Sequence, residues 1–114
     1  MSEKDLANLE AIIDSIKKII RFTSKFDNPD SFYDDEQAFD AVLMNFVIIG
    51  ETVSKLSQPL KKETKQVPWI KIKAFRNIIA HNYFGVDAEE VWQIINDQLP
   101  DLKVEITKII KKRN

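Results

Sequence analysis

The side chains with the most chemical potential lie close together, between positions 68 and 87. Here the chain has its only histidine, His81, with Arg76 and Asn77 before it and Tyr83 after it. An imidazole exchanges protons near neutral pH, a guanidinium is a permanent cation, and a phenol both donates and accepts hydrogen bonds. Together these groups suit a reaction at a phosphate group.

RNA cleavage is one reaction that these residue types could perform. It needs a base for the 2′-hydroxyl proton, an acid for the leaving 5′-oxygen, and a cation for the charge on the phosphorane. His81 and Arg76 fit these roles, but one imidazole cannot begin as both base and acid. A two-fold homodimer would bring two copies of the pair to one cleft, so we expect a dimer.

The spacing of the pair sets a geometric condition. In an unbroken helix Arg76 and His81 point about 140° apart. They can therefore meet only if the helix loosens near His81 or if a partner subunit completes the site. Asn77, one helical turn before His81, is expected to orient the imidazole.

The helix that carries these residues has two faces to bury. One stripe is largely apolar, and the other mixes small, apolar and polar residues, which indicates a central helix or one that faces another subunit. The first stripe comprises Ile72, Phe75, Ile79 and Tyr83 with Arg76 at its edge, and the second Ile70, Ala74, Asn77 and His81.

Five segments with apolar residues every three or four positions predict five helices. Residues 4–25 and 32–57 form the two longest, and the third starts near Trp69 and ends at Gly85. The fourth is capped at Asp87 and ends before Pro100, which opens the fifth. The fold class expected is an all-α, antiparallel up-and-down bundle of four to five helices. A short helical turn is possible around Pro59, and Ser31 with Asp34 is expected to form a capping box that opens the second helix.

The apolar stripes of the two longest helices predict the centre of the core. They are Leu6, Leu9, Ile13, Ile16 and Ile20 in the first helix, and Phe39, Val42, Phe46, Ile49, Val53 and Leu56 in the second. Trp69 and Trp92 lie in apolar helical patterns, so we expect them in the core rather than stacked on bases.

Composition limits the remaining possibilities. A chain of 114 residues with 44% hydrophobic and 31% charged residues fits one domain, 1–114, and two glycines and four prolines argue against an all-β fold. The absence of cysteine excludes disulfides and thiolate metal sites. There is no signal-like or membrane-spanning apolar run, so we expect a cytoplasmic protein that does not contact a membrane.

No cofactor or metal is expected from the sequence. The carboxylates at Asp34, Asp35 and Glu36 are better explained as a solvated capping turn than as ligands of a hard cation. The net charge of −1 gives no general attraction to nucleic acid, although residues 61–76 are mainly basic and residues 27–40 acidic. Charge alone therefore only permits contact with RNA.

The segment VPWIKIKAFRNIIAHNYFGVD, followed by VWQIINDQLPDLK, resembles the HepT family of the HEPN superfamily. The resemblance spans essentially the whole chain. It implies a helical homodimer that acts as a metal-independent endoribonuclease, the toxin of a HepT/MNT toxin–antitoxin system. Arg76 and His81 match the family's catalytic pair, and Asn77 matches the polar position between them. Tyr83 matches the tyrosine to which an MNT-type nucleotidyltransferase antitoxin transfers adenylyl groups from ATP.

Two other interpretations stay open at this stage. The first is a non-catalytic helical dimer whose Arg76, His81 and Tyr83 only dock the nucleotidyltransferase or RNA. The second is a structural bundle with an incidental motif, because a single histidine on a half-apolar face is often a structural residue. Loss of RNA cleavage on substitution of His81 or Arg76 would separate the enzyme from both.

Overall fold

The computed structural model describes residues 1–113, and within them it contains only helices and connecting turns. The all-helical bundle predicted from the sequence is confirmed. Five helices have ten or more residues, and two short ones, α2 and α4, lie in the connections. In chain order the elements are α1 (Glu3–Thr23), α2 (Pro29–Asp34), α3 (Glu36–Lys55), α4 (Gln58–Glu63), α5 (Trp69–His81), the 3-10 helix η1 (Tyr83–Gly85), α6 (Ala88–Asp97) and α7 (Leu99–Arg113).

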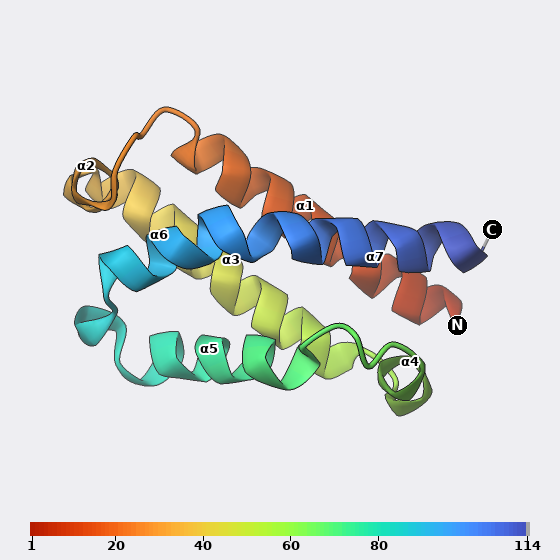
Figure 1. The fold of residues 1–114 in the computed structure, drawn as a ribbon. Helices are drawn as coiled ribbons and strands as arrows, with labels where there is room; N and C mark the ends of the chain where they lie inside the picture. Colours follow the sequence, from red (N-terminus) through yellow and green to blue (C-terminus); the bar gives the residue numbers. More distant parts are fainter. Residues whose placement is uncertain (114) are drawn as a thin grey trace.

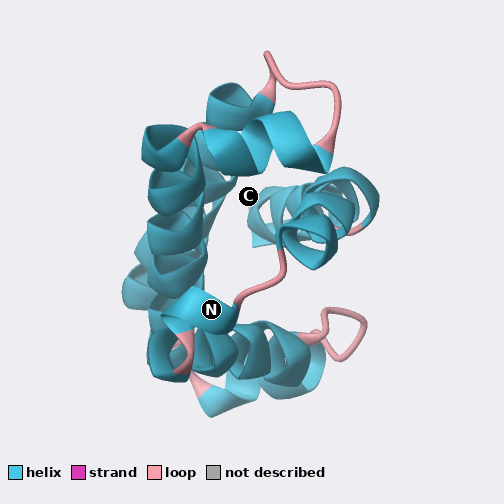
Figure 2. Cartoon of the chain, turned by 90° about the vertical axis from the view of Figure 1, so that its left-hand side faces the viewer, coloured by secondary structure: helices cyan, strands magenta, loops and turns pink. Residues whose placement is uncertain are grey.

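Helix α3 is the element around which the others are arranged. It packs on α1 along one side and on α5 along the other (Figure 1). Helix α7 lies along α1, and α6 contacts α2 and leads into α7. Figure 2 shows the described residues as helices joined by loops. No helix in residues 1–113 is both long and apolar enough to cross a bilayer.

The core follows the apolar stripes, with one adjustment. All six residues predicted for the α3 stripe are at most 7% exposed. In α1 the buried stripe is Leu9, Ile12, Ile16 and Ile19, so it is rotated slightly from the predicted one, and Ile20 is 37% exposed. Trp69 is buried, which confirms it as a core residue. Trp92 is only partly buried and packs against the core, with its ring 5.7 Å from that of Phe32.

The single helix predicted over residues 32–57 is wrong, because the chain breaks at Asp35. Its backbone is extended (φ −88°, ψ 92°), and its carboxylate accepts a hydrogen bond from the amide three residues later, which caps α3. Helix α2 is capped by Asn28, whose side-chain oxygen accepts from the Ser31 amide at 2.8 Å. These short oxygen-bearing side chains satisfy helix-end amides, so the capping box predicted at Ser31 and Asp34 is replaced by two separate caps.

The helix predicted to run to Gly85 ends at His81 instead. Asn82 leaves the helical conformation (φ −146°, ψ 57°), and its carbonyl accepts a hydrogen bond from Gly85 N at 3.0 Å. A Cβ atom at position 85 would lie 2.3 Å from the Asn82 side-chain nitrogen, so glycine lets this turn close tightly. The predicted cap at Asp87 is confirmed, since its carboxylate accepts from Glu89 N at 2.9 Å.

A buried carboxylate joins the start of α1 to the start of α4. Asp5 is 3% exposed, and its two oxygens accept from Ser57 N at 2.9 Å and Ser57 Oγ at 2.6 Å. Burial raises the pKa of Asp5, but hydrogen bonds from Ser57 and Ser2 outweigh it and leave the pKa below its usual 3.8. The ionised carboxylate therefore stabilises the fold.

We expect Asp5→Asn to lower the free energy of unfolding by about 1.5–3 kcal/mol near neutral pH, because hydrogen bonds to a charged group are lost. A depressed folded-state pKa contributes stability that is complete above the unfolded value and is lost as pH falls through the folded value. Urea unfolding should therefore show the gap between the two proteins closing below pH 3.8. Asp14→Asn, at an exposed position of α1, is the control. A gap that does not change with pH would contradict this role of Asp5.

Candidate functional site

Helix α5 is fixed to the bundle at its first turn and along its inner face. The Trp69 indole donates to Thr64 Oγ1 at 3.0 Å in a buried hydrogen bond. The Phe75 ring meets the Phe46 ring of α3 edge to face, with centroids 5.1 Å apart, and Ile79 is 1% exposed. These contacts confirm Phe75 and Ile79 of the predicted first stripe, whereas Tyr83, predicted to continue that stripe, lies beyond the helix in η1.

Arg76 lies where α5 approaches α3 closely. Gly50 is buried in the middle of α3, and a Cβ atom built on it would lie 2.2 Å from Arg76 Cβ and 2.6 Å from its Cγ. Real Cβ contacts are not this short, so only glycine allows the base of the Arg76 side chain to rest on the α3 backbone. The absent side chain of Gly50 therefore determines where the Arg76 side chain starts.

The guanidinium of Arg76 is held by two oxygen atoms. Its Nη2 forms an ion pair with Glu51 of α3, and its Nη1 donates to Asn77 Oδ1 at 2.9 Å. Its Nε is buried and has no hydrogen-bond partner among residues 1–113. Asn77 was expected to orient His81, but in the structure its oxygen accepts from Arg76. A planar cation with fixed partners presents its remaining surface to a ligand in a defined direction.

His81 is the last residue of α5, and its side chain is exposed. The imidazole makes no hydrogen bond or ion pair with any other described residue. The helix is regular through His81, so Arg76 and His81 remain about 140° apart in direction and about 7.5 Å apart along the axis. The helix loosens only after the histidine, at Asn82. Loosening of the helix therefore does not bring Arg76 and His81 together within one chain, and completion of the site by a partner subunit stays a prediction.

Tyr83 lies in η1 and is tied back to the first half of α3. Its hydroxyl donates a hydrogen bond to Asp40, and its ring meets that of Phe84 edge to face at 5.6 Å. Partial burial raises the pKa of Tyr83 to about 12, and the hydrogen bond to Asp40 and the charge of Asp40 act in the same direction. Because its pKa is raised, the phenol stays protonated near neutral pH. It is also 38% exposed, so a reagent can reach it.

Three residues of α3 that hold this site were not singled out from the sequence: Asp40, Gly50 and Glu51. Asp40 appeared only as part of an acidic stretch. A glycine inside a strongly helical pattern is an available signal, because it costs helix stability and often marks a close contact. The partners of the two carboxylates are set by how α5 packs on α3, which sequence spacing does not give.

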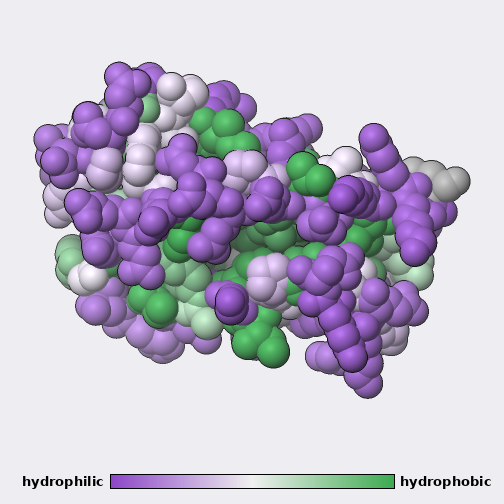
Figure 3. All heavy atoms as spheres, viewed as in Figure 1, coloured by the Kyte–Doolittle hydropathy of each residue, from purple (hydrophilic) through white to green (hydrophobic). Residues whose placement is uncertain are grey.

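The second stripe of α5 is open to solvent. Ile70 is 87% exposed and Ile78 is 53% exposed, and beyond the helix Phe84 is fully exposed. Figure 3 shows apolar side chains reaching the surface over and beside α5. Nothing within residues 1–113 covers this face, which fits the expectation that it meets another subunit.

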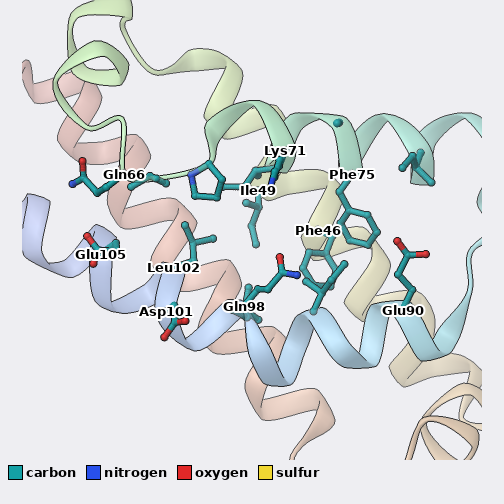
Figure 4. A pocket seen from close by; sticks show the side chains of 17 residues that line it. Phe46, Ile49, Gln66, Lys71, Phe75, Glu90, Gln98, Asp101, Leu102 and Glu105 are labelled. Atoms are coloured by element: carbon teal, nitrogen blue, oxygen red, sulfur yellow. The ribbon is translucent and has the colours of Figure 1, made fainter.

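A groove lies between α5 and the pair α6 and α7 (Figure 4). It has a volume of about 480 Å³ and is lined mainly by apolar side chains such as Ile49, Phe75 and Leu102. Arg76, His81 and Tyr83 are not among its lining residues. No group of three or more His, Asp or Glu side chains in residues 1–113 is placed to hold a metal ion.

The fold and the site together define a class of protein. It is an all-helical bundle with an arginine and a histidine on one helix and a tyrosine in the turn after that helix. The family model described as ribonuclease HepT-like matches residues 12–109. The chain therefore belongs to the HepT-like ribonuclease family, as the sequence motif indicated.

The relatives cover nearly all of the chain. A Methanocaldococcus jannaschii protein named "Putative RNase MJ0127" is 35% identical over 97% of this chain and 92% of its own length. "Probable ribonuclease HepT" of Thermococcus cleftensis is 32% identical over 96% and 97%, respectively. A third, "Gamma-glutamylcyclotransferase and putative RNase MJ0434" of M. jannaschii, is 33% identical over 91% of this chain but only 46% of its own length. No solved structure gives a significant match.

We expect Gly50→Ala to destabilise the protein by about 1–3 kcal/mol, because the new methyl group would overlap the base of the Arg76 side chain. Elsewhere in a helix the same change would stabilise by roughly 0.5–1 kcal/mol, so the sign of the effect is informative. Lys55→Ala, at an exposed position near the end of α3, is the control. Chemical denaturation of both variants measures the difference, and a stabilised Gly50→Ala protein would disprove the close approach.

Proposed function

We propose that this protein is the toxin of a HepT/MNT-type system, a metal-independent endoribonuclease that acts as a homodimer. The observation that carries the proposal is the placement of a fixed, partly exposed guanidinium and an exposed imidazole on one helix, beside an uncovered apolar stripe. The family match and the names of the relatives support it.

The reaction follows from these residue types. The imidazole of one His81 removes the proton of the 2′-hydroxyl, and the 2′-oxygen forms a bond to phosphorus. The bond from phosphorus to the 5′-oxygen breaks, and the protonated His81 of the partner subunit supplies a proton to this leaving group. Arg76 stabilises the charge on the phosphorane, with Asn77 fixing its orientation. The RNA phosphate competes with Glu51 for the guanidinium.

The dimer is part of the proposal because the site is incomplete in one chain. Arg76 and His81 point in different directions from a regular α5, so a single chain does not aim both at one phosphodiester. Ile78 lies beside the stripe that carries His81, about 60° from it around the helix, and is exposed. Pairing of two α5 stripes about a two-fold axis would bury this face and bring both histidines to one cleft.

The partner that we propose is an MNT-type nucleotidyltransferase antitoxin, which adenylylates Tyr83, masks the site, or does both. Asp40 and Glu51, which hold Tyr83 and Arg76, are eleven residues or about 16 Å apart along α3. Tyr83 follows His81 by two residues, so a bulky anionic group on it would act first at the histidine end of the site. Such a group would repel RNA phosphates and obstruct access to the imidazole.

A non-catalytic dimer that only binds the nucleotidyltransferase or RNA is the second candidate. The ion pair between Arg76 and Glu51 favours this second candidate, because it neutralises the cation within the chain. In that case RNA stays intact while binding of the partner is retained.

We expect the purified protein to cleave RNA in the presence of EDTA. Arg76→Ala should lower the rate about 10²–10³-fold by removing the cation, and His81→Ala about 10²–10⁴-fold by removing the proton carrier. Gel analysis of a defined RNA measures cleavage, and circular dichroism checks that each variant remains folded. Lys71→Ala, at an exposed position of the same helix, is the control. Intact RNA with the unchanged protein would contradict the enzyme.

We expect Ile78→Glu to convert the dimer to a monomer and to abolish cleavage, because a carboxylate would be buried in the α5 interface. Val104→Glu on α7 is a closely matched control, since the two side chains are 53% and 52% exposed in one chain. Light scattering at micromolar concentration gives the oligomeric state. An unchanged protein that is monomeric yet active would rule out the shared cleft.

A further inference from the structure

The two tyrosines of the chain differ in their surroundings. Tyr33 on α2 is 55% exposed, its ring packs against Phe39, and its hydroxyl has no hydrogen-bond partner in residues 1–113. Tyr83 is less exposed, at 38%, and its hydroxyl donates to Asp40. If exposure alone decided which phenol reacts with an electrophile, Tyr33 would be preferred.

The Tyr83 hydroxyl needs a proton acceptor in order to react. With a pKa of about 12, raised first by burial and then by Asp40, almost none of it is phenolate near neutral pH. A neutral phenol is a weak nucleophile, and an adjacent general base activates such a group when it lies within hydrogen-bonding reach. Asp40 already accepts the proton in question.

Asp40 is free to act as this base. The hydrogen bond with Tyr83 is the only one that the Asp40 carboxylate makes within residues 1–113, and this carboxylate forms no ion pair there. The side chain is exposed on α3, so a proton taken from Tyr83 can pass on to water.

The turn that carries Tyr83 holds the phenol in one place. The amide of Val86 donates to the backbone carbonyl oxygen of Tyr83 at 3.4 Å, and the amide of Gly85 donates to the backbone carbonyl oxygen of Asn82. The Phe84 ring lies against one edge of the phenol. Because the hydroxyl hydrogen points to Asp40, the lone pairs of the hydroxyl oxygen stay available to an incoming electrophile.

We propose that Asp40 is the general base that makes Tyr83, rather than Tyr33, the acceptor of an adenylyl group. This inference rests on the proposed modification of Tyr83. The Tyr83 oxygen forms a bond to the α-phosphorus of a nucleoside triphosphate, and the bond from that phosphorus to pyrophosphate breaks. The phenolic proton passes to the Asp40 carboxylate and then to solvent.

The first test uses an electrophile that needs no partner enzyme. The purified protein and Asp40→Asn are treated with an adenosine-linked sulfonyl fluoride, which modifies tyrosine oxygen with loss of fluoride, and peptides are quantified by mass spectrometry. We expect modification of Tyr83 to fall about 100-fold in Asp40→Asn, while that of Tyr33 is unchanged. Glu36→Gln, one helical turn earlier on α3, is the matched control.

Whether the modification rate of Tyr83 rises or falls in Asp40→Asn decides the inference. If Asp40 only keeps the phenol protonated, its removal lowers the pKa of Tyr83 and speeds the reaction. If Asp40 is the base, its removal slows the reaction. The rate for the unchanged protein is then nearly flat from about pH 6 to 9, while that of Asp40→Asn rises with hydroxide. A rate that is equal or faster in Asp40→Asn overturns the proposal.

The second test separates this inference from the proposed function. The protein is incubated with ATP and an MNT-type nucleotidyltransferase, the proposed partner, and the adenylyl group is located by mass spectrometry. Label on Tyr83 that is lost in Asp40→Asn supports both proposals. If the unchanged protein carries no label, the proposed modification is wrong. The rates with the sulfonyl fluoride then still test the role of Asp40. Label on Tyr83 that is unaffected by Asp40→Asn overturns the base alone.

Discussion

The close approach of α5 to α3 at Gly50 is the constraint on which the site depends. One missing side chain lets the base of Arg76 rest on the α3 backbone, and the guanidinium then reaches Glu51 and Asn77. Cores are packed too densely to absorb even one extra methyl group without movement. A helical glycine, which weakens its own helix, is thus compensated by the contact that it permits.

Helix α3 also acts as the template for the segment after α5. Along its length it contacts Arg76 through Glu51, Phe75 through Phe46, and Tyr83 through Asp40. Because Glu51 contacts Arg76 and the earlier Asp40 contacts the later Tyr83, one helix sets the spacing between the cation and the phenol. The histidine between them is left without a partner, so it is the member of the set whose surroundings a second subunit or an RNA would determine.

Much of the fold could be predicted from the sequence because helical periodicity is a local property. The α3 stripe, the cap at Asp87 and the burial of Trp69 were predicted correctly. The break at Asp35 and the end of α5 at His81 were not, because a capping side chain and a turn closed on a glycine compete locally with helix continuation. Of the site, the motif residues could be found, but the roles of Asp40, Gly50 and Glu51 depend on packing between helices.

The two ends of the chain lie at the same end of the bundle (Figure 1), and Arg113 at the end of α7 forms an ion pair with Glu3 at the start of α1. Figure 1 places both termini at the end of the bundle opposite the C-terminal end of α5, where His81 lies. An additional domain attached at either terminus would therefore begin at the far end of the bundle from His81. This geometry fits the relative in which the matching region is less than half of a longer polypeptide. Domain fusion is compatible with this fold because the attachment points are remote from the end of α5 that carries His81.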